Sequence, residues 1–536
     1  MYIHEAIAQR LVDHGITTVF GLVGDGNLFW VDDYAKFDAT NYIAVANEEG
    51  AILAANGYAQ VTGEVGVATV THGPAITNTI TALVESVRDS APLLVVVGDT
   101  APDDSMTLQK IPQREFIIPT GAGFEQARSE RTLLDDLDKA LRRAMAERRP
   151  IVFNIPINFQ WEEVEYSSVE PPWPVSQAVS ADPESIEQVV AMLATVKRPI
   201  VVAGRGAVDS REPLIALAAR IGAPLMTTLR GKDLFSDQTY NLGVFGTLSS
   251  PGGVEAIAAS DFVIALGSRL DRWGSVNGSL FAGKRVVQVD TRREILGSMT
   301  VPTLGIVGDA GKVADQIVEL LDEVEIPATG FRDTHPEWYR TESAATKQPE
   351  PDKPVAYEDA LVAIQDAVPA DRIYVLDAGR FSYRALTAFS VPGPRSFVYT
   401  MNFGSIGLGM GNAIGAAAAA PDRPVLMVCG DGGFMLGGLT EFNTAVRHNL
   451  DIIVVLFNDR SYGAEHIQLR ARGLDPAISV LDWPDFTEVA RALGGEGYAV
   501  STTADLAALP QVIADRTKPL LIEVRLDPDQ VTIPGK

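Results

Sequence analysis

The sequence predicts an α/β protein with three doubly wound domains, each built on a mainly parallel sheet. Short β-branched runs recur along the chain, and Gly, Pro or Asp bounds each of them. Each run is followed within a few residues by a longer stretch with helical spacing. Strands that alternate with helices are typical of parallel sheets covered by helices on both faces. The strand-like runs are residues 67–70, 93–97, 151–153, 200–202, 262–265, 286–289, 425–428 and 452–457.

The length predicts more than one domain, because 536 residues correspond to three or four domains at roughly 100–200 residues each. Two stretches interrupt the alternation of strands and helices. Residues 166–183 contain four prolines, and residues 326–354 are rich in Pro, Thr and charged side chains. Both have the composition of interdomain linkers. We therefore predict domains at residues 1–165, 184–325 and 355–536.

The composition argues against several classes of partner. The 69 acidic and 44 basic residues give a formal net charge of −25, which repels nucleic acids and anionic lipid surfaces. The single cysteine, Cys429, cannot form an internal disulfide. The first residues lack a basic region followed by an apolar run, and the longest apolar runs fall well short of the roughly 18–20 residues that span a bilayer. We expect a cytoplasmic protein without transmembrane segments that binds neither nucleic acids nor membrane surfaces.

A glycine turn in the third segment predicts a site for diphosphate and a cation. The strand-like run 425–428 leads into Gly430-Asp431-Gly432-Gly433, and a helical stretch follows at residues 439–447. Glycines let the backbone approach a ligand closely, and a helix N-terminus offers free N–H groups to an anion. Asp431 would repel a diphosphate unless a hard cation lay between them. Mg²⁺, which binds carboxylates together with phosphate oxygens, fits that position.

The next strand-like run, 452–457, ends in a second group of oxygen ligands. It leads into Asn458-Asp459 and then Ser461-Tyr462. Because the carboxyl ends of neighbouring parallel strands meet at one edge of a sheet, these oxygens are expected near Asp431.

The order of these motifs resembles that of the thiamine diphosphate (ThDP) enzymes of the acetolactate synthase, benzoylformate decarboxylase and pyruvate decarboxylase group. In that family Gly-Asp-Gly is followed by a paired Asn-Asn, so this chain departs at the second amide, Asp459. Aligning on Tyr462 gives the side-chain ligand role to Asp459 and the carbonyl role to Ser461, whereas counting forward from Asp431 favours Asn458. We prefer Asp459, because an extra residue is easily absorbed around residues 436–438, while the strand end is rigid.

The resemblance extends to the first segment. Residues 46–59 look like the start of the family's Glu-containing helix, with Asn47 in place of the usual His. Glu48 then takes the activating role: it protonates N1′ of the aminopyrimidine, and the resulting imino group removes the thiazolium C2 proton. Residues 71–78 are similar to a turn that packs beside the cofactor, which makes His72 a candidate active-site residue.

Further cofactor contacts are implied in the third segment. Residues 403–409 match the family loop that holds the cofactor in its V shape. Gly404 would offer its carbonyl to the 4′-amino group, and Ile406 would lie under the two rings. Arg380, which follows an earlier strand, is expected to add a diphosphate contact. Gly430, Gly432, Gly433 and Tyr462 complete the predicted cofactor contacts.

Substrate-facing residues point to different subfamilies. Asp25 and Glu465 match active-site acids of pyruvate decarboxylase, and two acids near C2 could pass protons to the product. The paired histidines of that enzyme are missing from residues 103–113, where Gln113 instead matches a glutamine of acetolactate synthase. The lysine of that synthase is missing in turn. His466, beside Glu465, is a further candidate for the pocket.

The resemblance implies a ThDP- and Mg²⁺-dependent lyase that decarboxylates a 2-oxo acid or cleaves a related ketone, with carboligation as a second outcome. The alternatives are an acetolactate synthase-like transferase, an FAD-containing 2-oxo acid oxidase, and a catalytically silent, nucleotide-binding regulatory subunit. Gly204-x-Gly206 in the middle segment is too weak a motif to decide whether FAD or a nucleotide binds there. In the family one cofactor lies between two subunits, so a dimer at least is implied, and we expect a homotetramer.

Overall fold

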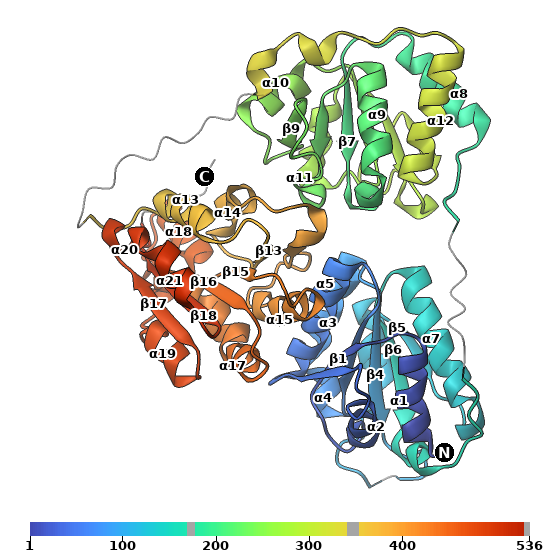
Figure 1. Ribbon diagram of the computed structural model, residues 1–536, viewed down its shortest axis with the longest axis vertical. Helices are drawn as coiled ribbons and strands as arrows, with labels where there is room; N and C mark the ends of the chain where they lie inside the picture. Colours follow the sequence, from blue (N-terminus) through green and yellow to red (C-terminus); the bar gives the residue numbers. More distant parts are fainter. Residues whose placement is uncertain (105, 169–176, 340–352, 530–536) are drawn as a thin grey trace. The chain divides into compact units, whose positions relative to one another are not determined.

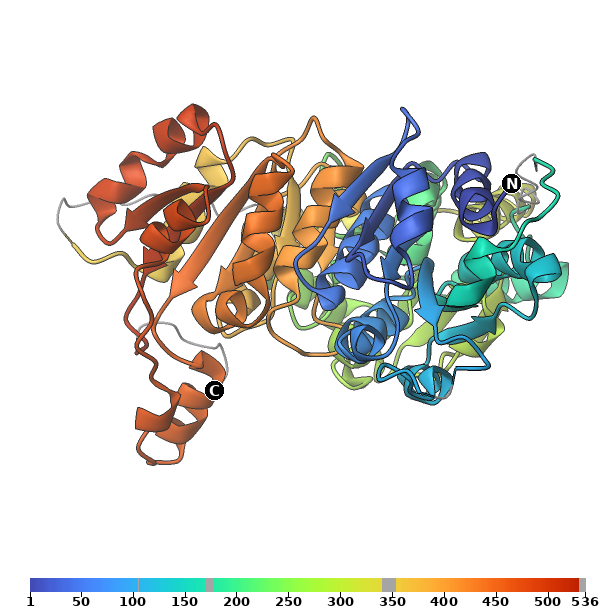
Figure 2. The same cartoon turned by 90° about the horizontal axis from the view of Figure 1, so that it is seen from below.

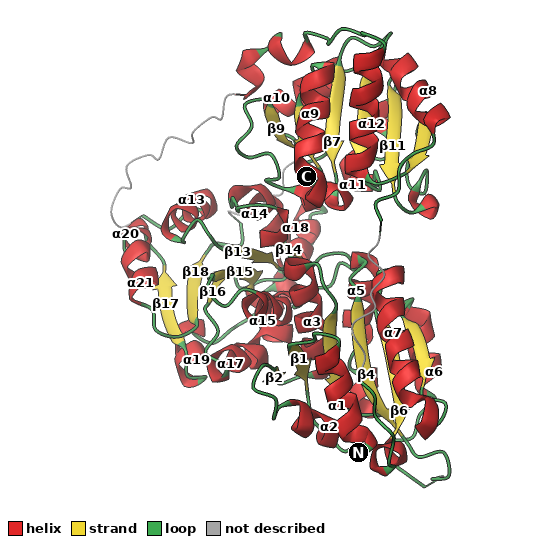
Figure 3. Cartoon of the chain, turned by 45° about the vertical axis from the view of Figure 1, so that its right-hand side comes forward, coloured by secondary structure: helices red, strands yellow, loops and turns green. Residues whose placement is uncertain are grey.

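The computed structural model describes residues 1–104, 106–168, 177–339 and 353–529. Parts of both predicted linkers, residues 169–176 and 340–352, lie outside the described residues. Three six-stranded sheets occur along the chain, and helices cover them on both faces (Figures 1 and 3). The predicted α/β class with three doubly wound sheets is confirmed. The exact domain boundaries stay a prediction.

The sheet of the first domain has the strand order β2-β1-β3-β4-β6-β5, and all its paired strands are parallel. Its strands are β1 (Thr18–Gly21), β2 (Asn41–Ala44), β3 (Gly66–Val70), β4 (Leu93–Asp99), β5 (Gly123–Gln126) and β6 (Ile151–Pro156). Its helices are α1 (Ile3–Asp13), α2 (Leu28–Tyr34), α3 (Glu48–Thr62), α4 (Pro74–Thr77), α5 (Ile80–Asp89), α6 (Gln113–Ile117) and α7 (Leu133–Glu147).

The sheet of the middle domain has the order β12-β11-β10-β7-β8-β9 and is also parallel throughout. Its strands are β7 (Pro199–Ala203), β8 (Leu225–Thr227), β9 (Asn241–Val244), β10 (Phe262–Leu266), β11 (Arg285–Asp290) and β12 (Leu304–Val307). Its helices are α8 (Pro183–Leu193), α9 (Arg211–Ile221), α10 (Pro251–Ala259), α11 (Arg272–Ser275) and α12 (Ala310–Glu323).

The sheet of the third domain has the order β14-β13-β15-β16-β18-β17 and is parallel from β13 to β17. Its strands are β13 (Ile373–Leu376), β14 (Phe397–Tyr399), β15 (Val425–Gly430), β16 (Ile452–Asn458), β17 (Glu496–Val500) and β18 (Leu520–Arg525). Its helices are α13 (Tyr357–Ala367), α14 (Ser382–Ala388), α15 (Gly409–Ala419), α16 (Asp431–Gly433), α17 (Leu439–Arg447), α18 (Gly463–Ala471), α19 (Phe486–Ala492), α20 (Thr503–Ala507) and α21 (Leu509–Asp515).

The strand orders locate the edges where ligands are expected. In the first sheet β1 lies between β2 and β3, and in the third sheet β13 lies between β14 and β15. In each of these sheets the strand order therefore reverses at this point. The crevice at the carboxyl ends of the strands on either side of such a reversal is the usual ligand site of an open α/β sheet. The residues predicted to bind the cofactor lie after β2 (Glu48), β13 (Arg380), β14 (Gly404 and Ile406), β15 (residues 430–433) and β16 (Ser461 and Tyr462).

The first and third domains form one compact unit, and the middle domain together with Ser390–Phe397 forms another. Within the first unit α3 packs directly on α15, and the blue and orange segments lie side by side in Figure 2. Glycines make this approach close. A Cβ atom added at Gly57 would lie 2.1 Å from the carbonyl oxygen of Asn412, and one at Gly415 would lie 1.8 Å from that of Ala54. A single hydrophobic core therefore runs through both domains.

Across the described residues, no helix has the length and the apolar character needed to cross a bilayer.

Candidate functional site

Asp431 is a buried carboxylate that lacks a complete set of hydrogen bonds. It is the first residue of α16, directly after β15, and is 3% exposed. Its Oδ1 accepts a hydrogen bond of 2.8 Å from the backbone N–H of Gly432, whereas Oδ2 is buried without a hydrogen-bond partner among the described residues. Burial and the nearby charge of Asp459 raise the pKa of Asp431 to about 7. A cation at Oδ2 would supply the missing interaction.

The helix that follows Asp431 contains a π-helical turn. Residues Phe434–Gly438 have this geometry, between α16 and α17. A π-turn holds one residue more than an α-turn and commonly occurs at functional sites. The turn includes residues 436–438, where the alignment on Tyr462 needs an additional residue. The alignment, and with it the choice of Asp459, stays a prediction.

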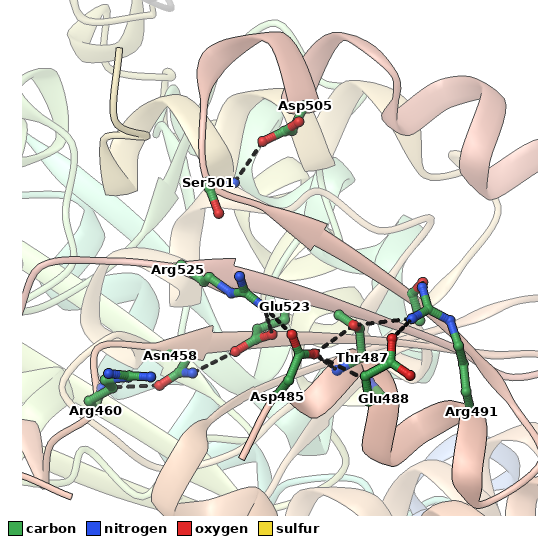
Figure 4. A network of polar contacts seen from close by, with 11 residues as sticks. Asn458, Arg460, Asp485, Thr487, Glu488, Arg491, Ser501, Asp505, Glu523 and Arg525 are labelled. Atoms are coloured by element: carbon green, nitrogen blue, oxygen red, sulfur yellow. Dashed lines mark hydrogen bonds and ion pairs between the residues drawn. The ribbon is translucent and has the colours of Figure 1, made fainter. Parts of the chain in front are cut away.

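The two candidate ligands after β16 point in different directions. The side-chain amide of Asn458 donates to Oε1 of Glu523 at 2.6 Å, and its Oδ1 accepts from the N–H of Arg460 at 3.1 Å (Figure 4). The Asn458 side chain is therefore held by Glu523 and by the Arg460 backbone. The charge of Asp459, in contrast, acts on Asp431 and helps to raise the pKa of that residue.

Asp459 is held by two neighbours. Its Oδ1 accepts from the N–H of Ser461 at 3.0 Å and from the Ser461 hydroxyl at 2.7 Å. Its Oδ2 forms an ion pair with Arg380. The Arg380 side chain is 2% exposed, its Nη1 donates to the carbonyl of Pro528 at 2.7 Å, and its Nε is buried without a partner among the described residues. Arg380 thus brings a positive charge to the same strand ends as Asp431 and Asp459.

These contacts predict different effects for the two neighbouring ligand candidates. Asp459→Ala is expected to weaken Mg²⁺-dependent ThDP binding by more than about tenfold, because it removes a charged ligand. Asn458→Ala is expected to lower the free energy of unfolding, because it leaves the buried Glu523 without its amide partner. Titration calorimetry measures the affinity, and thermal unfolding measures the stability. Loss of affinity in Asn458→Ala with unchanged affinity in Asp459→Ala would reverse the assignment.

The predicted cofactor loop around Gly404 packs on the Gly-Asp-Gly turn. Gly404 and Gly407 have φ values of +81° and +87°, which strongly favour glycine. The N–H of Gly407 donates to both carboxylate oxygens of Asp377 at 3.1 and 3.0 Å. A Cβ atom at Gly437 would lie 2.2 Å from the Gly407 carbonyl oxygen. Ile406, between the two glycines, is half-buried.

Asp377, which follows β13, anchors one end of this loop. It is fully buried, and burial raises its pKa to about 7 against the opposing hydrogen bonds from backbone N–H groups. The folded protein therefore holds a proton on Asp377 over a pH range in which the unfolded chain, with an ordinary aspartate, does not.

Stability is expected to depend on pH through Asp377. Relative to Asp377→Asn, which does not titrate, the wild-type free energy of unfolding should fall as the pH rises from about 4 to about 7, by up to about 1.4 kcal/mol per pH unit. Unfolding curves of both proteins at several pH values across this range measure the difference. A constant difference between the two proteins would mean that Asp377 is ionised throughout.

Glu48 is the first residue of α3. Asn47 caps this helix by accepting from the N–H of Glu49 at 2.8 Å. The Glu48 side chain is half-buried, and its Oε2 accepts a hydrogen bond of 3.0 Å from the side-chain amide of Asn78. Asn78 was not among the predicted site residues, although it closes the turn at residues 71–78 that the sequence points to.

His72 and Gln113 lie in a second group of polar residues, at the carboxyl edge of the first sheet. His72 is 1% exposed, with Nδ1 3.2 Å from the Thr71 hydroxyl. Burial lowers its pKa, and the charges of Asp25 and Asp99 oppose that shift. The charge of Asp25, itself exposed, is therefore felt at the buried ring of His72. A neutral imidazole beside two carboxylates can accept or donate a proton.

Gln113 faces the interior. It accepts from the N–H of Gly73 at 2.8 Å and donates to the Gly98 carbonyl at 2.9 Å and to Oδ1 of Asn154 at 2.5 Å. Asn154 in turn donates to Asp99 at 2.5 Å. Gln113 therefore holds the backbone next to His72. Asp99 and Asn154 were missed by the sequence analysis, because each follows or lies in a buried strand without a motif of its own.

Glu465 and His466 lie on α18. Glu465 is exposed, and His466 is buried with both ring nitrogens engaged. Its Nδ1 lies 3.2 Å from the Ser479 hydroxyl, and its Nε2 lies 3.1 Å from Asp529. His466 therefore connects α18 to Ser479 and Asp529. Tyr462, directly before α18, packs on the Gly-Asp-Gly turn, because its ring lies 2.7 Å from where a Cβ of Gly432 would be.

In the middle domain a packing contact accounts for the Gly204-x-Gly206 motif. These glycines follow β7, and Gly267 follows the adjacent strand β10. A Cβ at Gly204 would lie 2.2 Å from the Gly267 carbonyl oxygen, and the N–H of Gly206 donates to the same oxygen at 3.0 Å. The two turns need small residues to approach each other, with or without a nucleotide.

Among the residues that the structure describes, no group of three or more His, Cys, Asp or Glu side chains could hold a metal ion by itself. The predicted cation site at Asp431 has two carboxylates, Asp431 and Asp459, so backbone and ligand oxygens would have to complete it. Mg²⁺ bound together with phosphate oxygens has this requirement. Glycine turns at the carboxyl ends of parallel strands, next to a predicted cation site, are typical of α/β proteins that bind a diphosphate-bearing ligand.

Comparison with known families identifies this class. The description "Thiamine pyrophosphate enzyme, N-terminal TPP binding domain" matches residues 1–117, the central domain of the same enzymes matches residues 186–317, and their C-terminal TPP binding domain matches residues 377–524. The chain belongs to the thiamine pyrophosphate enzymes, thiamine pyrophosphate being another name for ThDP. The resemblance seen in its motifs is thereby confirmed.

Curated relatives match along most of their length. Sulfoacetaldehyde acetyltransferase of Alcaligenes xylosoxydans is 28% identical, with 95% of this chain and 90% of the relative aligned. Probable 2-ketoarginine decarboxylase of Pseudomonas aeruginosa is 28% identical, with 91% and 88% aligned. The large subunit of acetolactate synthase isozyme 1 of Escherichia coli is 26% identical, with 99% and 95% aligned. The three named reactions differ, so the relatives leave the reaction of this chain open.

Proposed function

We propose that the chain is a ThDP- and Mg²⁺-dependent lyase that decarboxylates a 2-oxo acid or cleaves a related ketone. Carboligation of the cleaved fragment to an acceptor aldehyde is its second reaction. The observation that carries the proposal is the buried, unpartnered Oδ2 of Asp431 beside Asp459. This arrangement fits a site for Mg²⁺ and diphosphate, because a buried carboxylate without a partner costs free energy, and a bound cation would offset that cost.

The cofactor would be held by residues of the third domain. Asp431, the Asp459 side chain and the Ser461 carbonyl would bind Mg²⁺. Arg380 offers a buried Nε–H to an anionic group, and Gly430, Gly432, Gly433 and Tyr462 would line the diphosphate. Gly404 would bind the aminopyrimidine through its carbonyl, and Ile406 would support the two rings.

ThDP, when bound, supplies a carbon nucleophile that attacks a carbonyl group and an electron sink for the bond that breaks. The residues of the first domain move protons and position the reactants. Glu48 would hold a proton at N1′ of the pyrimidine. His72, Asp25 and Glu465 are the candidates that deliver a proton to the product carbon. Gln113 keeps the turn beside His72 in place through Gly73.

A homodimer at least is part of the proposal, and a tetramer is its expected assembly, because relatives of this family share each cofactor between two subunits. The cytoplasmic location expected from the composition stays a prediction.

The test is to incubate the purified protein with ThDP and Mg²⁺ and a panel of 2-oxo acids, with and without acceptor aldehydes, and to follow the products by NMR. Release of an aldehyde or formation of a 2-hydroxyketone supports the proposal and identifies the donor. Flavin released on denaturation, together with oxygen consumption, would favour the oxidase instead. Failure to bind ThDP would favour the silent regulatory subunit.

A further inference from the structure

A buried glutamate of the first domain binds the backbone of the third domain just before the cofactor loop. Glu85 on α5 is fully buried. Its Oε1 accepts from the N–H of Asn402 at 3.0 Å and from the Asn402 side-chain amide at 2.7 Å, and its Oε2 accepts from the N–H of Phe403 at 2.6 Å. Phe403 immediately precedes Gly404.

Arg88, one turn along α5, binds the same two residues. Its guanidinium lies over the Phe403 ring, 4.7 Å from the ring centroid, and its Nη1 lies 3.4 Å from the Asn402 carbonyl oxygen. Glu85 accepts from the backbone of this segment, and Arg88 donates to it. Together they bind both the N–H groups and a carbonyl group of the segment 402–403. This segment lies at one end of the Gly404 loop, and Asp377 binds the other end.

The third domain binds the first domain in the same manner. Glu441 on α17 is 1% exposed, and its two carboxylate oxygens lie 3.2 and 3.3 Å from the N–H of Ala46. Arg447 on the same helix donates to the Ala44 carbonyl at 2.7 Å. A Cβ at Gly50 would lie 2.2 Å from Oε1 of Glu441, so this approach depends on a glycine in the first turn of α3. The segment 44–46 lies just before Glu48.

Packing alone does not account for these two carboxylates. Burial raises the pKa of both Glu85 and Glu441, which reflects the cost of placing each charge in the interior. An apolar side chain of similar volume would fill the same space at less cost. The carboxylates add directed hydrogen bonds. Each of them accepts from the backbone N–H of one peptide segment and so fixes the position of that segment. Both segments lead directly into residues assigned above to the cofactor.

We propose that Glu85 with Arg88, and Glu441 with Arg447, are reciprocal positioning pairs: each cofactor-binding domain holds in place the segment that carries the other domain's cofactor residues. The proposal rests on the proposed function, since it takes Glu48 and Gly404 as cofactor residues. Glu85 sets the position of the Gly404 loop and thereby the affinity for ThDP. Glu441 sets the position of Glu48 and thereby the activation of the bound cofactor.

The test compares Glu85→Gln and Glu441→Gln with the wild type. Each change keeps the volume of the side chain but removes the negative charge that strengthens its hydrogen bonds, and it turns one acceptor oxygen into an NH₂ group that cannot accept from an N–H. Three quantities are measured: hydrogen exchange of peptides covering residues 400–404 and 44–48 by mass spectrometry, the affinity for ThDP by calorimetry, and the exchange rate of the ThDP C2 proton. The near-ultraviolet circular dichroism of bound ThDP reports how the cofactor is held.

The two variants should affect different quantities: Glu85→Gln mainly the affinity for ThDP, and Glu441→Gln mainly the exchange rate of the C2 proton. Glu85→Gln is expected to speed hydrogen exchange at 400–404 and to weaken ThDP binding about tenfold, the usual effect of losing a hydrogen bond to a buried charged group. Glu441→Gln is expected to speed exchange at 44–48 and to slow C2 proton exchange about tenfold, with a smaller change in affinity. Asp138→Asn is the matched control, because Asp138 is a buried carboxylate of the first domain bound to Arg10 and His14. It should change only stability.

If Glu85→Gln does not fold, Arg88→Ala replaces it, because Arg88 is exposed; it should weaken ThDP binding, whereas Arg142→Ala, also exposed, should not. A wild-type protein that does not bind ThDP would overturn the proposed function and, with it, this inference. A wild type that binds ThDP, with Glu85→Gln and Glu441→Gln both equal to it in affinity and C2 proton exchange, would leave the proposed function standing and refute the positioning pairs.

Discussion

Replacing Glu48 by Gln is expected to slow exchange of the C2 proton of bound ThDP by roughly 100- to 10,000-fold, the range that a positioned acid or base contributes. An amide at this position could not hold a proton at N1′, which is the role proposed for Glu48. The affinity for ThDP should change far less, because the diphosphate and Mg²⁺ contacts belong to the third domain. Quenched-flow exchange into D₂O, followed by NMR of the released cofactor, measures the rate.

The adjacent residue is a close control for this change. Glu49 stands in the same first turn of α3, and burial raises its pKa. Glu49→Gln should leave the C2 exchange rate within about threefold of the wild type, because Glu49 has no proposed role in the proton transfer and contributes little to that rate. Equal rates for Glu48→Gln and the wild type would remove Glu48 from the mechanism. A large effect in Glu49→Gln alone would move the role by one residue.

Replacing Asp431 by Asn is expected to have opposite effects on binding and on stability. The affinity for ThDP and Mg²⁺ should fall by more than about 100-fold, since even residues behind the metal ligands contribute 10- to 100-fold. The protein without cofactor should become more stable by about 1–3 kcal/mol, because a buried, unpartnered carboxylate oxygen is replaced by a neutral amide. Calorimetric titration and thermal unfolding in the absence of cofactor measure the two effects.

The control for Asp431 is an aspartate with a structural role. Asp485 caps α19 by accepting from the N–H groups of Thr487 and Glu488 (Figure 4). The Thr487 hydroxyl first, and then the Glu488 N–H and the Arg525 side chain, lower the pKa of Asp485 to about 2, while burial opposes this shift. Asp485→Ala should lower stability by about 0.5–2 kcal/mol and leave ThDP affinity unchanged. If Asp431→Asn also lowers stability and keeps the affinity, Asp431 is a structural residue like Asp485, and the cation site is not there.

Several predicted site residues could be recognised because their signal is local. Gly430 to Gly433 lie in a strand–turn–helix sequence, and such a turn presents backbone N–H groups wherever it occurs. Glu48 stands at the first position of a helix whose start is visible in the sequence. The structure puts both at the expected ends of strands and helices, and the family comparison agrees with the motifs from which they were derived.

Other parts of the site could not be predicted from local patterns. Asp377 follows a short strand without a motif, and its role comes from the Gly407 N–H, 30 residues away. From the sequence, Asp459 is preferred as the side-chain ligand and Asn458 is the alternative, and this choice stays a prediction. The structure adds their partners: Glu523, 65 residues from Asn458, and Arg380, 79 residues from Asp459. Each of these partners comes from a different strand end of the same sheet.

The sequence by itself determined the class of fold, the glycine turns and the family, because helix and strand periodicity, glycine conformation and short motifs depend on neighbouring residues. Only the tertiary structure decided which charges meet. The contacts of Glu85 with Asn402 and of Glu441 with Ala46 join residues 317 and 395 positions apart. They arise because α3 and α15 pack closely through glycines, which brings α5 and α17 against the opposite domain's segments. No local pattern encodes such a meeting, since it depends on how two complete domains pack.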